Sequence, residues 1–325
     1  YYTRDDKDQI ISVTSAPQSG YSTRKMNAGL IRNRGVELSL GGMPVSTKNW
    51  KWEMNFNIAK NSNKLVELAD GVDSYSIYWT SFTTRLYNYA MVGKSLGVIT
   101  GNTWERDDNG NIIFHELSAS QKALYGGEYV PTYNQNTLDE LGNFHPDCTG
   151  GFNTSISFKN FRLSANIDFS VGGQIVSYTN MWGSSSGILD KTAELNDRGV
   201  NVREPVSKGG GIHMTGVDQN GNKVDTYVNA KLYYTTASRV WEEWVYDRTY
   251  VKLREVSLSY VFPSQTLKKL NIGLSRVSVA INASNPWLIY SACPNVDVSE
   301  IGMGYFEGGN AAATRSIGFT VNLAF

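Results

Sequence analysis

Few residues in this sequence have the type and spacing that catalysis or metal binding requires. Gly183-Ser-Ser-Ser-Gly187 matches the letters of the nucleophile elbow of hydrolases. That motif needs a sharp strand-to-helix turn that presents the serine beside a histidine, whereas this segment reads as a serine-rich loop. His115, His145 and His213 are scattered without metal-ligand spacing. We therefore expect no catalytic residue and no metal site, and we predict that the chain is not an enzyme.

Two short segments combine carboxylates and amides with a glycine, as calcium-binding loops do. They are Asp107-Asp-Asn-Gly-Asn111 and Asp218-Gln-Asn-Gly-Asn222. Neither has the bidentate glutamate that completes a calcium loop. An Asn-Gly pair also favours a tight hairpin turn, and we predict turns at both places.

Aromatic residues gather in segments that we predict to be loops. Exposed rings of this kind stack on sugars or grip a peptide, and they equally pack loops together or contact a partner protein. Both interpretations remain open for any one ring. The candidate ligand or lid contacts are Tyr78, Trp79, Trp104, Trp182 and Trp244.

The composition limits the classes of protein to which the chain can belong. Its 325 residues carry 30 basic and 30 acidic side chains. Balanced charge without basic clusters does not favour a nucleic-acid partner. No apolar run approaches the ~18 residues of a membrane helix. A membrane β-barrel also lacks such a run, because its lipid-facing and lumen-facing residues alternate. Two cysteines are too few for a disulfide-dense scaffold, and nothing in the sequence indicates a cofactor.

The last twelve residues alternate strictly between apolar and small or polar side chains. A period of two places the apolar side chains on one face of a strand. Lipid-facing strands of outer-membrane barrels alternate in this way, and the alternative is the terminal strand of a soluble β-sandwich. The apolar set is Ile317, Phe319, Val321, Leu323 and Phe325.

The same alternation recurs in pairs of segments that we predict to be hairpins. The first pair surrounds a connection at residues 41–49, in which Gly41-Gly-Met-Pro44 ends a strand. The second turns at Lys159-Asn160, and the third turns at Pro263. In the strand before Pro263 the apolar positions change parity, which predicts a β-bulge near Arg254-Glu255.

Long and short connections sort to opposite ends when strands are counted back from Phe325. The short ones, including a predicted turn at Gly93-Lys-Ser-Leu96, all fall at the end that faces the periplasm in membrane barrels. The count predicts about ten strands, of which the first is cut. It also places both Cys148 and Cys293 at the outer end, where we expect no disulfide bond. The long connections are residues 62–82, 106–147, 173–245 and 285–313.

Alternation also assigns side chains to the two faces of the wall. Trp50 and Trp52 lie at the periplasmic end, where an aromatic girdle is expected. The residues predicted to face lipid are Trp52, Phe56, Ile156, Leu163, Phe319 and Leu323. Those predicted to face the lumen are Glu53, Asn55, Arg162, Asp168 and Asn322.

Several motifs, in order along the chain, resemble those of the SusC/RagA family of TonB-linked outer-membrane transporters. Asn27-Ala-Gly-Leu-Ile-Arg-Asn-Arg-Gly-Val-Glu37 is similar to the family's NxGxxxNxGxE stretch. Gly150-Gly-Phe-Asn153 with Phe158-Lys-Asn-Phe-Arg-Leu-Ser164 resembles its GGF…YKxFxLS hairpin. Asp247-Arg-Thr-Tyr-Val-Lys-Leu-Arg-Glu-Val-Ser-Leu-Ser-Tyr260 looks like SYVRLRxVxLxYxxP. In the last loop Asn285-Pro-Trp-Leu-Ile-Tyr-Ser-Ala-Cys-Pro294 departs from the family pattern.

The resemblance implies an all-β fold, in which residues 1–325 form the C-terminal part of a plugged, 22-stranded transmembrane antiparallel β-barrel. The plug, the TonB-contacting segment and the early strands would then lie outside this chain. We expect the strand that ends at Phe325 to pair with one of those missing strands. It should not close a small barrel with residues 1–10.

The function implied by this family is TonB-dependent import of a bulky nutrient, a glycan or a peptide, across the outer membrane of a Gram-negative, Bacteroidetes-like cell. The implied partners are TonB, outer-membrane lipid and a SusD-type surface lipoprotein that acts as a lid. The alternatives are a passive porin or structural barrel, and a secreted carbohydrate-binding β-protein.

Overall fold

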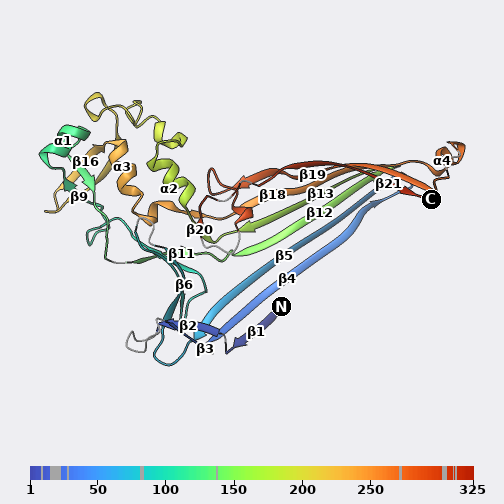
Figure 1. Cartoon of the computed structure of the whole chain (residues 1–325), viewed down its shortest axis with the longest axis horizontal. Coiled ribbons are helices and arrows are strands. Elements are labelled where there is room, and N and C mark those ends of the chain that lie inside the picture. The colour runs from blue at the N-terminus through green and yellow to red at the C-terminus, as the bar shows by residue number, and fades with distance from the viewer. Residues whose placement is uncertain are drawn as a thin grey trace.

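An antiparallel sheet of eight strands forms the main body of the structure (Figure 1). The computed structural model describes residues 1–8, 10–14, 23–27, 29–80, 84–136, 138–270, 273–301, 306–309, 311 and 313–325. Every neighbouring pair of strands in the sheet is antiparallel. In spatial order the strands are β1 (Tyr2–Lys7), β4 (Leu30–Ser46), β5 (Trp50–Glu67), β12 (Cys148–Phe158), β13 (Phe161–Val171), β18 (Tyr250–Val261), β19 (Arg276–Ser291) and β21 (Ser316–Ala324).

The register of the sheet aligns apolar side chains into continuous rows. Directly paired residues lie on the same face of a sheet, so each row belongs to one face. Phe319, at one end of such a row, is 68% exposed, as expected for a face that contacts lipid rather than protein. The row consists of Trp52, Ile156, Leu163, Leu258, Ile281 and Phe319.

Polar side chains occupy the opposite face and bond to one another there. The Arg162 guanidinium lies 3.3 Å from the Glu53 carboxylate and donates to the Ser155 hydroxyl at 3.0 Å. Asn55, two residues after Glu53 on β5, pairs with Asn153. The division of the wall into an apolar and a polar face is therefore confirmed, and the predicted lipid-facing and lumen-facing sets fall on opposite sides.

The predicted bulge in β18 is also confirmed. The pairing of β13 with β18 shifts register between Asn166 and Ile167, which pair with Glu255 and Leu253 and leave Arg254 as the extra residue. Glu255 pairs with Asn166 on the polar face, while the Arg254 guanidinium bonds to Asp168 on that same face. The bulge thus places two successive charged side chains on the polar side of the wall.

The prediction that Gly41-Gly-Met-Pro44 ends a strand is wrong. β4 continues to Ser46, and its pairing with β5 shifts register between Gly42 and Val45. Proline has no N–H to donate, and a bulge is one of the few places in a sheet that tolerates it. The hairpin turn is therefore shorter than expected and is closed by a 2.7 Å bond from the Thr47 N–H to the Trp50 carbonyl.

The predicted count of about ten strands is also wrong for the described residues, because two of them do not join the wall. β7 (Leu86–Met91) and β8 (Val98–Gly101) have six and four residues, and a tilted strand needs ~9–11 to cross a bilayer. The turn expected at the periplasmic end lies instead beside the outer end of β5, where Gly93 N–H donates to the Leu65 carbonyl at 2.8 Å. Residues 68–147 therefore form one connection from β5 to β12.

The two termini lie at opposite edges of the main sheet. β1 pairs with β4, and β21 pairs with β19. Among the described residues β21 does not pair with β1, so the chain does not close a small barrel by itself. This agrees with the expectation from the sequence.

The long connections fold into smaller sheets and short helices at one end of the wall (Figure 1). Their strands are β6 (Ser74–Thr80), β9 (Ile113–Glu116), β10 (Tyr129–Pro131), β11 (Asp139–Asn143), β14 (Gln174–Ser177), β15 (Ile212–Asp218), β16 (Lys223–Val228), β17 (Val245–Asp247) and β20 (Phe306–Glu307), and β2 (Ile10–Thr14) pairs with β3 (Thr23–Asn27). Their helices are α1 (Ala119–Tyr125), α2 (Tyr178–Ser185) and α3 (Ala230–Ala237) with the 3-10 turns η2 (Asp190–Ala193), η3 (Val206–Lys208), η4 (Trp241–Trp244) and η5 (Val298–Glu300). At the opposite end, α4 (Ser264–Leu270) connects β18 to β19. None of the described helices is long and apolar enough to cross a bilayer.

A charge on the apolar face should be far more harmful than the same charge on the polar face. We expect Phe56→Arg to reduce the folding free energy of the full-length protein by about 2–4 kcal/mol in a bilayer. The matched control is Asn55→Arg, one residue away on the polar face, which should cost much less. Urea titration of the folded, heat-modifiable fraction in lipid vesicles measures both, and equal losses would contradict the assignment of faces.

Candidate functional site

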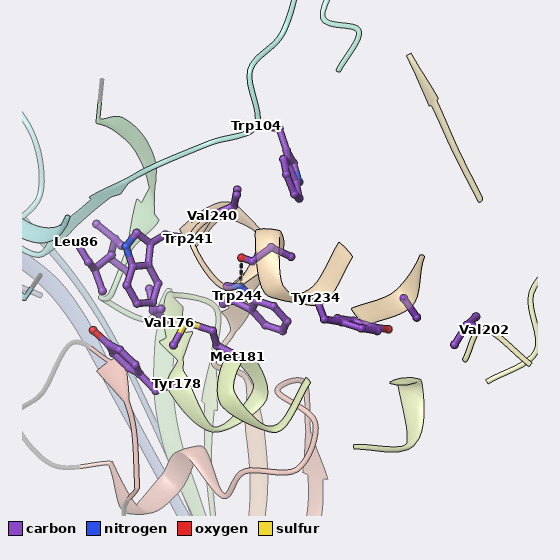
Figure 2. Close-up of a cluster of buried hydrophobic side chains, with 13 residues drawn as sticks. Leu86, Trp104, Val176, Tyr178, Met181, Val202, Tyr234, Val240, Trp241 and Trp244 are labelled. Atoms are coloured by element: carbon purple, nitrogen blue, oxygen red, sulfur yellow. Dashed lines mark hydrogen bonds between the residues drawn. The ribbon is translucent and has the colours of Figure 1, made fainter. Parts of the chain in front are cut away.

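The connections at the outer end share an apolar core in which Trp241 and Trp244 are fully enclosed (Figure 2). The Trp244 indole N–H donates to the Ala237 carbonyl at the end of α3, at 2.7 Å. The Lys191 ammonium lies 4.3 Å from the centroid of the Trp244 ring. Trp244 is 1% exposed, so the ring packs the loops together and no ligand reaches it in this conformation.

Trp104 has a similar structural position. It is 3% exposed, and its indole N–H donates to the Glu243 carboxylate at 2.6 Å. The neighbouring Glu242 forms a salt bridge with Arg106 at 2.8 Å. These contacts tie the 102–106 segment to η4, so Trp104 also supports the loop core.

Tyr78 and Trp182 lie in a different setting, at an open cavity of about 600 Å³. Their side chains are 41% and 44% exposed. Phe306 joins the two sides of the cavity, with its ring centroid 4.9 Å from that of Tyr78 and 5.1 Å from that of Tyr178. Of the five candidate contacts the structure thus brings two together. Trp79 belongs to β6, but its side chain lies outside the described residues.

Helix α2 forms one wall of this cavity. The Ser177 hydroxyl caps its N-terminus by accepting from the Asn180 N–H at 3.1 Å. Gly183-Ser-Ser-Ser-Gly187 begins inside this helix rather than in a loop, which corrects the expectation from the sequence. A Cβ on Gly183 would lie 2.7 Å from the Leu189 side chain, so the glycine allows the helix to pack closely on the next segment.

The sequence analysis did not identify a buried ionic cluster between the wall and the last loop. The Lys252 ammonium, 1% exposed, lies 2.7 Å from the Asp297 carboxylate and 2.6 Å from that of Glu300. Arg254 bridges Glu300 to Asp168 on β13. A cation removed from water in this way needs opposite charges beside it. In the sequence, the cluster is indicated only by the two basic residues that flank Leu253, next to the predicted β-bulge.

These charges alter the protonation of the loop carboxylates. Burial acts to raise the pKa of Asp297, but hydrogen bonds from Lys252 and Ser299 outweigh it and hold that pKa below its ordinary value. The hydrogen bond from Lys252 likewise lowers the pKa of Glu300. Both carboxylates are therefore ionised at neutral pH, and the cluster fixes η5 against β18.

Both acidic segments form tight turns, as predicted. The Asp218 carboxylate accepts from the Asn220 and Asn222 backbone N–H groups at 2.8 and 2.9 Å. Asp107 makes the equivalent bonds to residues 109 and 111. The carboxylate oxygens thus accept hydrogen bonds from backbone N–H groups within each turn. This explains why both segments have an aspartate two residues before Asn-Gly-Asn.

Cys148 and Cys293 are free cysteines at the outer end of the wall. Cys148 begins β12, whereas Cys293 is 1% exposed in the last connection. Burial raises the pKa of the Cys293 thiol to about 12, so this thiol stays protonated and unreactive at neutral pH.

His213 links two of the outermost segments. Its ring nitrogens each lie 2.8 Å from a carboxylate oxygen, one on Asp197 and one on Asp225. The ring also stacks on Tyr227 at 4.8 Å, whose hydroxyl donates to Asp197. The hydrogen bond to Asp225 is the main reason that the pKa of His213 is raised.

Because that pKa is raised, the imidazolium stabilises this contact below the ordinary histidine pKa of ~6.5. The contribution is lost as the pH rises through the higher folded-state value. We expect hydrogen exchange in β15 and β16 to accelerate over this range, after correction for intrinsic rates, and His213→Gln to remove the pH dependence. His115→Gln is the control, since a His115 ring nitrogen contacts Gln219 and, among the residues that the structure describes, no carboxylate. An unchanged pH profile in His213→Gln would refute the role of this contact.

Comparison with known proteins shows which proteins the chain resembles. No family model matches the chain. It is 27% identical over 305 residues to TonB-dependent receptor P3 of Formosa agariphila, covering 91% of this chain and 28% of that protein. It is 31% identical over 183 residues to TonB-dependent receptor SusC of Bacteroides thetaiotaomicron, covering 54% of this chain and 17% of that protein. The chain therefore spans about a third or less of the length of these relatives.

Solved structures show the same fold. The RagAB peptide importer in its closed-closed state matches 99% of this chain and 33% of its own chain, with a TM-score of 0.69 and 18% sequence identity. Its open-open state matches with a TM-score of 0.68 and 16% identity. The all-β wall, its alternating faces and its sequence relatives agree: the chain is similar to TonB-dependent receptors and forms part of a transmembrane antiparallel β-barrel.

Proposed function

We propose that the protein containing this chain imports a bulky nutrient, a glycan or a peptide, across the outer membrane, with energy supplied through TonB. The observation that carries this proposal is the similarity to a TonB-dependent receptor along 91% of the chain. A barrel of more than 20 strands has a lumen wide enough to need a plug. Moving that plug against a closed membrane requires energy from outside the bilayer, and no residue of this chain takes a catalytic role.

Residues 1–325 form the C-terminal part of that barrel in this proposal. A strand edge in lipid leaves backbone N–H and C=O groups unpaired, and each such group costs several kcal/mol. The free edges of β1 and β21 then pair with further strands of the same barrel. The polar face of the wall, with Arg162 and Glu53, faces the plug.

The outer end receives the solute and a SusD-type surface lipoprotein that closes over it. The support is the open cavity at Tyr78 and Trp182, whose rim also carries Ile188 at 77% exposure. Exposed aromatic and aliphatic side chains beside polar loops are typical of surfaces that bind a ligand or a protein. Trp104 and Trp244 contribute indirectly, because they hold the loops that form this cavity.

The transport proposal predicts dependence on TonB. Cells that express the full-length protein should take up labelled oligosaccharides or oligopeptides, and deletion of TonB should abolish that uptake. Purified protein in liposomes should cause no swelling in small sugars, because the plug closes the lumen. TonB-independent uptake together with rapid swelling would identify a passive porin instead.

Exposed and buried tryptophans should differ when replaced. We expect Trp182→Ala to weaken solute or lipoprotein binding by up to about tenfold, since an aromatic contact contributes ~0.5–1.5 kcal/mol beyond its area. Trp244→Ala should instead destabilise the loop core by about 3–5 kcal/mol, seen as faster proteolysis of the outer loops. Leu195→Ala is the control, because Leu195 is 68% exposed and does not line the cavity. Equal binding by Trp182→Ala and wild type would exclude Trp182 as a contact.

A further inference from the structure

The two ends of the wall carry opposite charge although the whole chain is neutral. The connections at the outer end, residues 8–29, 68–147, 172–249 and 292–315, contain 23 Asp and Glu against 15 Lys and Arg. The connections at the short-turn end, residues 47–49, 159–160 and 262–275, contain four lysines and no Asp or Glu. We call these four lysines the basic rim: Lys48, Lys159, Lys268 and Lys269.

All four lysines of the basic rim are exposed. Within the part of the chain that the structure describes, none of them forms a salt bridge with a carboxylate. Two other basic side chains near this end, Lys51 and Arg162, are both paired with Glu53, whereas Arg276 at the start of β19 is exposed. The basic rim therefore presents positive charge that the protein does not neutralise itself.

A row of aromatic side chains borders the basic rim on the apolar face. Trp50 pairs with Phe158, and Phe161 pairs with Tyr260. Their ring centroids lie 4.3 Å and 4.7 Å apart. Aromatic belts of this kind mark the depth at which the hydrocarbon of a bilayer gives way to headgroups. Residues just beyond the row are therefore at the level of lipid phosphates.

Lys159 connects the row to the basic rim. Its ammonium lies 5.3 Å from the centroid of the Phe158 ring, so it sits beside the lipid-facing surface and not in the lumen. Its φ is 52°, in the left-handed region that Asn and Gly adopt more readily than lysine. Local backbone preference does not explain a lysine at this position.

We propose that the basic rim binds the phosphate groups of glycerophospholipids in the leaflet that faces the periplasm. Lysine is a compact point charge on a flexible stem, which lets its apolar part lie along the barrel while the ammonium reaches a headgroup. Lipid is favoured over a periplasmic protein because Lys159 lies at the aromatic row. This inference depends on the membrane position of the barrel and not on the identity of the imported solute.

The test compares two fourfold variants of the full-length protein. The rim variant is Lys48→Gln, Lys159→Gln, Lys268→Gln and Lys269→Gln. The control is Lys25→Gln, Lys208→Gln, Lys223→Gln and Lys231→Gln, which removes the same charge from exposed lysines at the outer end. Both are titrated with dioleoylphosphatidylglycerol, and with dioleoylphosphatidylcholine as the zwitterionic probe, while native mass spectrometry counts the bound lipids.

The wild type and the outer-end control should bind phosphatidylglycerol on the order of tenfold more tightly than the rim variant. Added salt should reduce that difference, because exposed charges are screened. Equal binding by the wild type and the rim variant would overturn the proposal. So would a rim variant that binds lipid normally but loses an acidic periplasmic protein on purification, since that result assigns the rim to a protein partner.

Folding of each variant is checked by its heat-modifiable mobility. If the rim variant does not fold, the fourfold Lys→Arg variant and the wild type still decide the question. Both must prefer phosphatidylglycerol to phosphatidylcholine, and the absence of that preference in the wild type refutes the proposal without any variant.

Discussion

A strand that crosses a bilayer must pair its backbone N–H and C=O groups with neighbouring strands, because hydrocarbon offers them no other partner. The long, nearly uninterrupted registers of the main sheet satisfy this requirement. The need to pair backbone groups also limits where the sheet tolerates β-bulges. The bulge at Arg254 lies four residues inside the outer end of β18, and the one between Gly42 and Val45 lies at the hairpin end of β4. At the hairpin end, neighbouring groups or water replace the lost pairs, and at the inner bulge the Arg254 side chain bonds to Asp168 and Glu300.

Since one face of the wall contacts lipid and the other is polar, the sheet does not build the apolar core of a soluble protein. That core is found instead in the outer connections, around Trp241 and Trp244. The loops are therefore a packed structure of their own, which can hold the cavity at Tyr78 and Trp182 in a defined shape. A binding surface on such a base loses less conformational entropy than one made of free loops.

Charged residues tie the wall to these loops. Lys252 and Arg254 extend from the polar face of β18 and hold η5 through Asp297 and Glu300. Removing one member would leave a buried charge without its partner, which is more costly than never having had the pair. These contacts thus fix η5 of the last connection at the mouth of the barrel.

Alternation alone determined the faces of the wall, and the change of parity around Arg254 determined its bulge, because both follow from the two-residue period of a strand. The number of strands depended on tertiary structure. Adding or removing two successive strands does not change the end of the wall at which any other connection lies. The incorrect turn at Gly93 was therefore still consistent with long connections at one end and short ones at the other. The roles of the aromatic rings were also decided by tertiary structure. Trp182 and Trp244 look alike in sequence, but only the packing of distant segments encloses one ring and leaves the other at an open cavity.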